Sequence, residues 1–272
     1  MRASKVVRSW GELLKLIREF RQSKNKWVFR GQLSRWELTT ALERQCQKSG
    51  IGLNAVKEIE HKIIRDFRRL YDGNDRETVR EDTLYCLSLM QHYGAPTRLM
   101  DWTYSPFIAT YFALEYAQDH DGEDGALWCL NVDWCWEKAR TVAGAKVIKM
   151  RNACRNEQTF QTLYMGDKPR KLVFLENPFL LHTRLSRQQG VFLCQGDVTS
   201  SLVDNLKNLD PDGYNNMENV LKIGCKLTRE SRIDALEELH QMNIDRTILF
   251  PGLEGFAKSL NYRLEFYRKL EI

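Results

Sequence analysis

The sequence lacks the cysteine and histidine spacing that marks a zinc site or a disulfide framework. Its 272 residues include seven cysteines, an odd number, and no two of them form a Cys-x-x-Cys pair. None of the five histidines is paired at metal-ligand spacing. These absences argue against a zinc ribbon and a disulfide-stapled domain, so we expect reduced, mostly buried thiols and no bound metal.

Four common catalytic or nucleotide-binding motifs are also missing. The chain has no Gly-x-x-x-x-Gly-Lys loop, no Gly-x-Gly-x-x-Gly fingerprint, no His-Glu-x-x-His pair and no Gly-x-Ser-x-Gly elbow. Each motif positions particular atoms for phosphate binding, zinc hydrolysis or acyl transfer. Any chemistry must therefore be carried by another arrangement of side chains.

No apolar run is long enough to cross a bilayer. The most apolar stretch, residues 107–117, falls well short of a membrane span and is typical of a buried helix. The first ten residues carry three basic side chains with no apolar segment after them, so we expect no signal peptide. We therefore predict a cytoplasmic protein with no membrane partner.

The composition is that of a folded protein with a basic balance. Hydrophobic residues make up 43% and charged residues 28% of the chain, which excludes a disordered polypeptide. The net charge of +5 permits a nucleic-acid or nucleotide partner without requiring one. We expect a single domain over residues 1–272, with a helical subregion at about 38–91.

The hydrophobic periodicity predicts helices and strands that do not alternate regularly. Residues 92–105 are predicted to be an irregular loop, and residues 133–166 have no clear assignment. The mixture predicts an α+β fold with a mixed sheet and several packed helices, rather than a doubly wound sheet. The predicted helices are 10–21, 54–71, 83–91, 106–118, 231–242 and 253–270, and the predicted strands are 27–31, 126–132, 171–175, 191–195 and 220–227.

The segment 91–106 concentrates titratable, aromatic and hydroxyl side chains between two apolar helices. Such a loop is either a binding site or a structural connection whose polar groups satisfy one another. His92 would be a general base or a hydrogen-bond donor to phosphate in the first interpretation, and a structural hydrogen-bonding residue in the second. Arg98 and Asp101 could form a local ion pair. The helix that begins at Ser105 offers free backbone N–H groups to an anion.

Arg30 lies at the end of a short, buried predicted strand, directly before Gly31. Its guanidinium would either bind a phosphate or carboxylate, or pair with an internal acid. Gly31 would let a ligand approach the backbone. Glu60 lies beside the apolar stripe of its helix, and a partly buried carboxylate there needs a partner such as Arg30 or Arg98.

Two further features admit both a functional and a structural interpretation. The amide of Gln188 could form hydrogen bonds with a ribose hydroxyl or with an amide group of a ligand, or it could cap the edge of a strand. The helix predicted at 54–71 carries a basic face that is either simply solvated or in contact with nucleic acid. That face consists of Lys57, Lys62, Arg65, Arg68 and Arg69.

Several segments resemble the FRG domain family in their sequence and in their order along the chain. Together they extend over nearly the whole chain. The central run is long and specific. The matching segments are Phe29-Arg30-Gly31, residues 60–67, Gln91-His92-Tyr93-Gly94 with Pro96-Thr97-Arg98-Leu99 and Asp101-Trp102-Thr103, then Arg184 with Gln188 and Gly190, and Leu249-Phe250-Pro251.

The motif order of this family is similar to that of ADP-ribosyltransferases. The resemblance implies a transferase-like core with a helical insertion and NAD as substrate, with no metal. It also implies a nucleic-acid (for example RNA) or protein acceptor, and a toxin or phage-defence effector with a neutralising antitoxin-type partner. Gln188 stands where most active transferases have Glu, so Glu60 or Asp101 would supply the catalytic carboxylate.

The same resemblance implies roles for individual residues. The implied catalytic residues are Arg30, Glu60, His92, Asp101 and Gln188, and the implied NAD contacts are Arg30, Gly31, Tyr93, Thr97, Arg98, Trp102, Thr103 and Ser105. Two other functions stay open: a non-catalytic nucleotide- or anion-binding module, and a metal-independent nuclease with His92 as the base.

Overall fold

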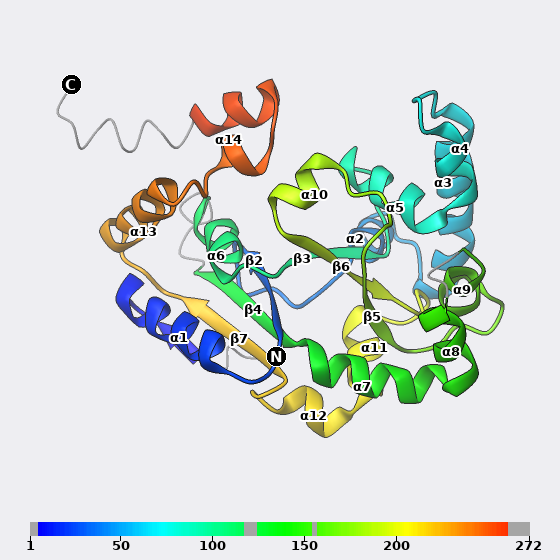
Figure 1. Cartoon of the computed structure of the whole chain (residues 1–272), viewed down its shortest axis with the longest axis horizontal. Helices are drawn as coiled ribbons and strands as arrows, with labels where there is room; N and C mark the ends of the chain where they lie inside the picture. Colours follow the sequence, from blue (N-terminus) through cyan, green and yellow to red (C-terminus); the bar gives the residue numbers. More distant parts are fainter. Residues whose placement is uncertain (1–4, 117–123, 154–156, 261–272) are drawn as a thin grey trace.

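Seven strands form one sheet in the computed structural model, which describes residues 5–116, 124–153 and 157–260 (Figure 1). The strand order across the sheet is β1-β7-β4-β2-β3-β6-β5. The β1–β7 pair is parallel and all other neighbours are antiparallel. The strands are β1 (Lys5–Val7), β2 (Trp27–Gln32), β3 (Leu99–Thr103), β4 (Gly125–Asn131), β5 (Val173–Glu176), β6 (Gly190–Gln195) and β7 (Val220–Cys225).

Helices of very different lengths surround this sheet. The longest are α1 (Trp10–Gln22), α3 (Val56–Leu70), α7 (Val132–Ala143) and α13 (Arg229–Gln241). The others are η1 (Leu53–Ala55), α2 (Ala41–Lys48), α4 (Arg76–Glu81), α5 (Thr83–His92), α6 (Pro106–Leu114), α8 (Ala145–Ala153), α9 (Glu157–Phe160), η2 (Gln161–Met165), α10 (Thr183–Arg187), α11 (Leu202–Leu209), α12 (Pro211–Asn215) and α14 (Arg246–Leu249), and residues 253–260 are also helical.

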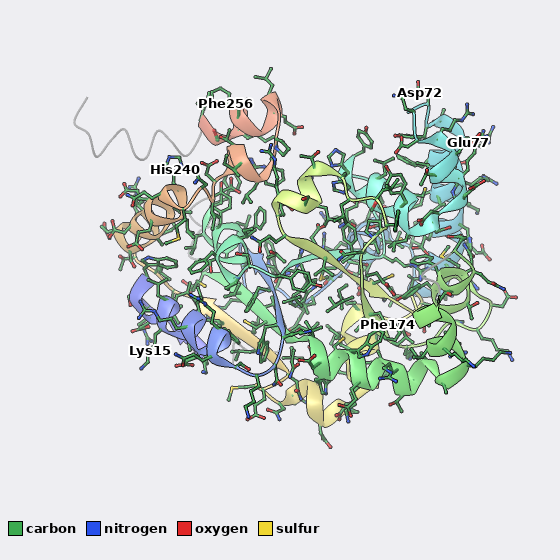
Figure 2. The ribbon with its side chains drawn as sticks, viewed as in Figure 1. Lys15, Asp72, Glu77, Phe174, His240 and Phe256 are labelled. Carbon is green, nitrogen blue, oxygen red and sulfur yellow. The ribbon has the colours of Figure 1, made fainter. Side chains whose placement is uncertain are left out.

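The middle of the sheet is buried on both faces. All seven residues of β4 are buried, and their side chains alternate between two hydrophobic cores. Trp128 and Leu130 enter the core shared with α5, α7 and α11, whereas Leu127 and Cys129 enter the core shared with α1, α6 and α13. Helices therefore cover both faces of the sheet, and side chains fill the space between the layers (Figure 2).

Two glycines allow α6 to lie directly on the sheet. A Cβ atom at Gly31 would lie 1.9 Å from the carbonyl oxygen of Ala109, and one at Gly125 would lie 2.1 Å from that of Ala113. No side chain fits at such distances. Gly31 therefore serves helix–sheet packing, and its expected role in letting a ligand approach the backbone stays a prediction.

The sheet opens between β2 and β3. These strands share one residue pair, Phe29 with Thr103, whereas β2 pairs with β4 at six positions and β3 pairs with β6 at five. The sheet thus consists of two well-paired parts, β1-β7-β4-β2 and β3-β6-β5, which touch near Phe29 and diverge beyond it.

The structure confirms the α+β class and the mixed sheet. Each predicted strand is present, and each predicted helix is present at least in part. The prediction of an irregular loop at 92–105 is wrong, because residues 99–103 form β3, which pairs with β6. The predicted helix at 106–118 already ends at Leu114. The segment 261–270 of the last predicted helix lies outside the described residues.

The chain between β2 and β3 is helical wherever it is regular, with α2, η1, α3, α4 and α5 in succession. The unassigned segment 133–166 also proves to be largely helical. The six described cysteines are free and buried, as expected, and Cys154 lies outside the described residues.

Candidate functional site

A cavity of about 790 Å³ opens where β2 and β3 diverge. Both strands contribute residues to its wall, as do α2, the second half of α6 and the segments that carry Arg184 and Phe250. This volume falls within the range of small-molecule and cofactor pockets. The predicted site residues that line it are Arg30, Gly31, Asp101, Trp102, Thr103 and Gln188.

Arg30 bridges the gap between the two strands. Its Nη1 donates to the backbone carbonyl oxygen of Asp101 at 2.7 Å, and its Nε is buried without a hydrogen-bond partner among the described residues. Burial lowers the pKa of Arg30, while the charge of Asp101 acts in the opposite direction. A guanidinium nevertheless stays charged, so Arg30 presents an under-satisfied cation to the cavity.

The carboxylate of Asp101 is exposed in this cavity and is held in place by two hydrogen bonds in series. Gln91 donates from Nε2 to Oδ1 of Asp101 at 2.8 Å, and the hydroxyl of Thr97 donates to Oε1 of Gln91. The second bond fixes which end of the amide faces Asp101. Thr97 is fully buried, so its position indicates support of Asp101 rather than the expected contact with NAD.

Positive charge predominates in the cavity wall. Its four basic residues are Arg30, Arg44, Lys48 and Arg184, and its three acidic residues are Glu37, Asp101 and Glu115. Cations outside the wall neutralise two of these acids. Arg246 donates to both oxygens of Glu115 at 2.8 Å, and Lys222 lies 3.9 Å from Glu37.

The remaining charges favour an anionic ligand. Burial lowers the pKa of Arg44 and of Arg184, and Asp101 partly offsets that effect at both sites. Arg184 also stacks on Phe250, with its guanidinium carbon 4.5 Å from the ring centroid, and Arg246 lies at 4.6 Å from the same ring. An anion bound among these guanidinium groups would offset the free-energy cost of burying Arg30 and Arg184, whereas Arg44 is exposed.

Gln188 and Thr103 join the parts of the wall to one another. The amide of Gln188 donates to the carbonyl oxygen of Leu249 at 3.0 Å, and the hydroxyl of Thr103 donates to the carbonyl oxygen of Gln188 at 2.7 Å. Trp102 is almost completely buried and packs in the core. These contacts are structural. Among the described residues, Asp101 is the acid of the wall that forms no ion pair.

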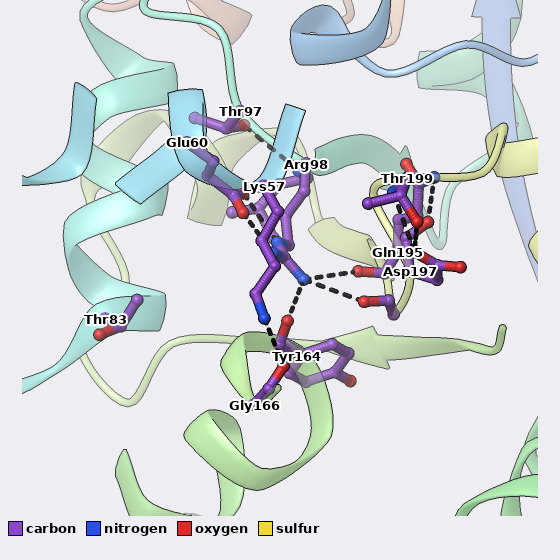
Figure 3. Close-up of polar contacts among 12 residues, drawn as sticks. Lys57, Glu60, Thr83, Thr97, Arg98, Tyr164, Gly166, Gln195, Asp197 and Thr199 are labelled. Carbon is purple, nitrogen blue, oxygen red and sulfur yellow. Dashed lines mark hydrogen bonds and ion pairs between the residues drawn. The ribbon is translucent and has the colours of Figure 1, made fainter. Parts of the chain in front are cut away.

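Glu60 and Arg98 form an ion pair away from the cavity (Figure 3). Both side chains have no solvent exposure, and Arg98 donates from Nε to Oε1 of Glu60 at 2.7 Å and from Nη2 to Oε2. Its Nη1 donates to the carbonyl oxygens of Tyr164, Gln195 and Gly196. The expected pairing of Glu60 with Arg98 is therefore confirmed, and the alternative pair of Arg98 with Asp101 is wrong.

Burial also removes Glu60 and Arg98 from contact with a ligand in the cavity. Arg98 directly precedes β3. Because successive side chains of an extended segment point to opposite faces, Arg98 and Asp101, which are three residues apart, point to opposite faces of the sheet. Arg98 instead ties α3 to η2 and to the end of β6. The pair holds the helical subregion against the sheet, and Asp101 is the better placed of the two candidate carboxylates.

His92, Tyr93 and Ser105 also lie outside the cavity wall. His92 and Tyr93 end α5 and are exposed, and the His92 ring lies 4.8 Å from that of His182. Ser105 caps α6 by accepting from the backbone N–H of Ile108 at 3.3 Å. The wall is formed by the other end of α6, so the helix N-terminus does not serve as its anion site.

His182 has an unusual environment beside His92. Its Nδ1 accepts a hydrogen bond from the backbone N–H of Leu185 at 3.2 Å, which places the proton of the neutral ring on Nε2. That Nε2 is buried without a partner among the described residues. Burial, followed by the charges of His92 and Arg184, lowers the pKa of His182 to about 4, so the ring is neutral at pH 7.

The described residues offer neither a metal-binding cluster nor a membrane-spanning helix. No group of three or more His, Cys, Asp or Glu side chains in them is arranged to hold a metal ion. None of their helices combines the length and the hydrophobicity needed to cross a membrane.

Sequence reasoning did not single out Arg44, Arg184 or Phe250 as site residues. Arg44 lies on α2, a helix whose eight residues were not recognised. Arg184 and Phe250 lie in the segments that resemble the FRG family, and this was the available signal. Only the fold shows that these residues meet Arg30 and Asp101 in one cavity.

Comparison with known families identifies one part of the chain. The model of the FRG domain matches residues 25–122, whereas no curated protein and no solved structure matches the chain. The matched segment contains β2 and β3 and hence both strands that diverge around the cavity. It includes Arg30, Arg44 and Asp101. Residues 25–122 therefore belong to the FRG domain family.

Proposed function

We propose that the cavity between β2 and β3 binds NAD and that the protein transfers the ADP-ribosyl group to a nucleic-acid or protein acceptor. The observation that carries this proposal is the exposed carboxylate of Asp101 in a cavity whose wall also contains Arg30, Arg44 and Arg184. A dinucleotide needs cations for its diphosphate and a fixed negative charge near the reacting sugar.

The geometry supports an extended nucleotide rather than a small anion. The cavity of about 790 Å³ exceeds what a phosphate or carboxylate requires, and its wall includes Trp36, Phe112 and Phe250. Trp36 is half exposed, so its ring is accessible to a ligand. Arginine groups that bind the diphosphate and aromatic groups that contact the rings would together orient NAD.

In the proposed reaction Asp101 stabilises positive charge on the ribose. The bond from C1′ to nicotinamide breaks, and its electron pair leaves with nicotinamide. A nucleophile of the acceptor then forms a bond to C1′ and releases its proton. The sugar becomes oxocarbenium-like between these events, and a fixed carboxylate stabilises that transition state more than the ground state. Gln91 and Thr97 keep the Asp101 carboxylate oriented.

The same cavity could also bind a nucleotide without turnover, because its arginines do not depend on catalysis by Asp101. Measuring nicotinamide release and NAD affinity separately distinguishes the two functions. A transferase could act as a toxin or phage-defence effector, and an antitoxin-type protein would then neutralise it. These roles depend on finding turnover first.

The test compares the wild type with Asp101→Asn, Arg30→Ala and the control Asp72→Asn, which changes an exposed acid in the loop after α3. We expect Asp101→Asn to lose about 100-fold in nicotinamide release while NAD affinity stays within a few-fold of the wild type. Arg30→Ala should lose both, and Asp72→Asn neither. Binding without release in the wild type would establish the binding module, and neither binding nor release would exclude both functions.

A further inference from the structure

A second hollow, of about 460 Å³, lies on the helical subregion between α3, α4, α5 and η2. It is independent of the cavity between β2 and β3, since the two share no lining residue. Its wall contains five basic or potentially basic residues and no acidic one. These are His61, Arg65, Arg68, Arg69 and Arg80, and we refer to them and the hollow as the arginine groove.

Helical periodicity places four of these side chains together. Positions 61, 65, 68 and 69 follow the spacing i, i+4, i+7 and i+8, which keeps them on one face of α3. Arg80 on α4 adds its charge from the neighbouring helix. The stretch from His61 to Arg69 is about 12 Å long, at about 1.5 Å per residue. One strand of a duplex advances by three to four phosphates over a similar distance, at about 3.4 Å each.

Arg68 is held in place without losing its charge. It donates from Nε to the carbonyl oxygen of Val79 at 3.0 Å and from Nη2 to the hydroxyl of Thr83 at 2.8 Å. Both acceptors are neutral. The nearby carboxylate of Glu157 is engaged by the backbone and hydroxyl of Thr83, at 2.7 and 2.5 Å, and by Gln161 at 2.5 Å. Arg68 is thus held in a fixed orientation, and the charges of Asp82 and Glu157 offset part of its own.

The other arginines of the groove are weakly compensated. Arg65 lies 3.4 Å from Asp66, but both side chains are more than half exposed, so this pair is screened by solvent. In the described parts of the chain, no ion pair involves Arg69 or Arg80, and both are exposed. The groove therefore carries net positive charge.

We propose that the arginine groove binds the phosphodiester backbone of a nucleic acid. The groove supplies several guanidinium groups over about 12 Å of α3 together with one from α4, and arginine contacts to phosphates are the usual basis of backbone recognition. It contains no aromatic side chain on which a base could stack. Recognition is therefore independent of sequence and sensitive to salt. This inference does not depend on whether the other cavity turns over NAD.

The test measures binding of short fluorescent probes to the full chain by polarisation. The first variant is Arg69→Gln/Arg80→Gln, and the matched control is Arg18→Gln/Arg21→Gln, which removes two exposed charges from α1, away from the groove (Figure 1). Both pairs change net charge equally. The probes are single-stranded RNA and duplex DNA, and polyglutamate of the same total charge is the competitor.

We expect the wild type to bind the nucleic-acid probes with a steep dependence on salt between about 50 and 200 mM. The groove variant should bind about tenfold more weakly at low salt, with the logarithmic salt slope reduced by roughly 1.4 to 1.8, because about 0.7 to 0.9 is lost per phosphate contact. The control should change neither quantity appreciably. Circular dichroism verifies that each variant is folded.

Three outcomes would overturn the proposal. The wild type could fail to bind either probe, or the control could weaken binding as much as the groove variant, which would indicate a general charge effect. Polyglutamate could also displace RNA at equal charge concentration, which would identify an acidic protein surface as the partner. None of these outcomes depends on NAD, so a failure here is separable from a failure of the proposed transferase function.

Discussion

The Nη1 of Arg30 donates to the backbone carbonyl oxygen of Asp101 at 2.7 Å, across the gap where β2 and β3 no longer pair. A side chain thus replaces a backbone contact at the mouth of the cavity. Arg30 holds the strand that carries the candidate catalytic carboxylate and also presents its remaining donors to a ligand. These two tasks need a branched guanidinium with several N–H groups.

Replacing Arg30 by Lys should therefore weaken NAD binding even though the charge is kept. The ammonium group cannot reproduce the planar fork that reaches Asp101 and a diphosphate together, so we expect a loss of about tenfold in affinity. Isothermal titration calorimetry measures it, with Arg35→Lys as a control of the same chemistry outside the cavity wall. Equal affinity for Arg30→Lys and the wild type would contradict the assigned role.

Replacing Glu60 by Gln should destabilise the fold rather than impair catalysis selectively. The change leaves Arg98 buried without its counter-charge, which typically costs about 3–5 kcal/mol in the free energy of unfolding. Glu58→Gln changes an exposed carboxylate on the same helix and should cost less than about 0.5 kcal/mol. Urea unfolding measures both variants. A Glu60→Gln protein as stable as the wild type but unable to release nicotinamide would instead make Glu60 the catalytic carboxylate.

Adding a methyl group at Gly31 should displace α6 from the sheet. The new Cβ would lie 1.9 Å from the carbonyl oxygen of Ala109 and 2.9 Å from the Cβ of Phe112, so we expect Gly31→Ala to destabilise the protein by at least about 1–3 kcal/mol. Gly11→Ala is the matched control. It lies in α1, where a Cβ atom would meet the Oγ of Ser9 at an ordinary contact distance of 4.0 Å, and it should stabilise by about 0.5–1 kcal/mol. Thermal unfolding of the two variants should move in opposite directions.

Stability should fall between about pH 6.5 and 4 because of His182. Burial lowers the pKa of His182 to about 4, whereas an unfolded histidine titrates near 6.5. In this window the unfolded chain binds a proton that the folded protein does not, so lowering the pH favours unfolding. The contribution of neutral His182 to the free energy of unfolding is thus fully present above about pH 6.5 and declines as the pH falls.

A variant that keeps the cap without titrating isolates this effect. His182→Asn retains a side-chain acceptor for the backbone N–H of Leu185. Between about pH 7.5 and 5 we expect the wild type to lose on the order of 1–2 kcal/mol more than this variant, after allowing for partial exposure of the ring. Urea unfolding at both pH values measures the difference. An identical loss in the two proteins would show that His182 does not cause the pH dependence.

The sequence alone determined the class of fold and most of its elements, because hydrophobic periodicity and helix caps are local properties. Ser9 and Ser105 directly precede the helices predicted at 10–21 and 106–118, and each caps its helix. The same local signals failed for β3, whose five residues lie among the polar and aromatic side chains of a segment that was predicted to be a loop. Pairing with β6 decides its conformation, and that pairing joins residues about 90 positions apart in the chain.

Only the tertiary structure decided which candidate residues form a site. The motif order pointed to Arg30, Glu60 and Asp101 alike, and it could not show that one carboxylate is buried against Arg98 while the other faces a cavity. Burial and the direction of a side chain depend on which elements pack together, not on the residue type. Arg44, Arg184 and Phe250 join the cavity for the same reason, since long-range packing brings α2 and the segments around α10 and α14 to the gap between β2 and β3.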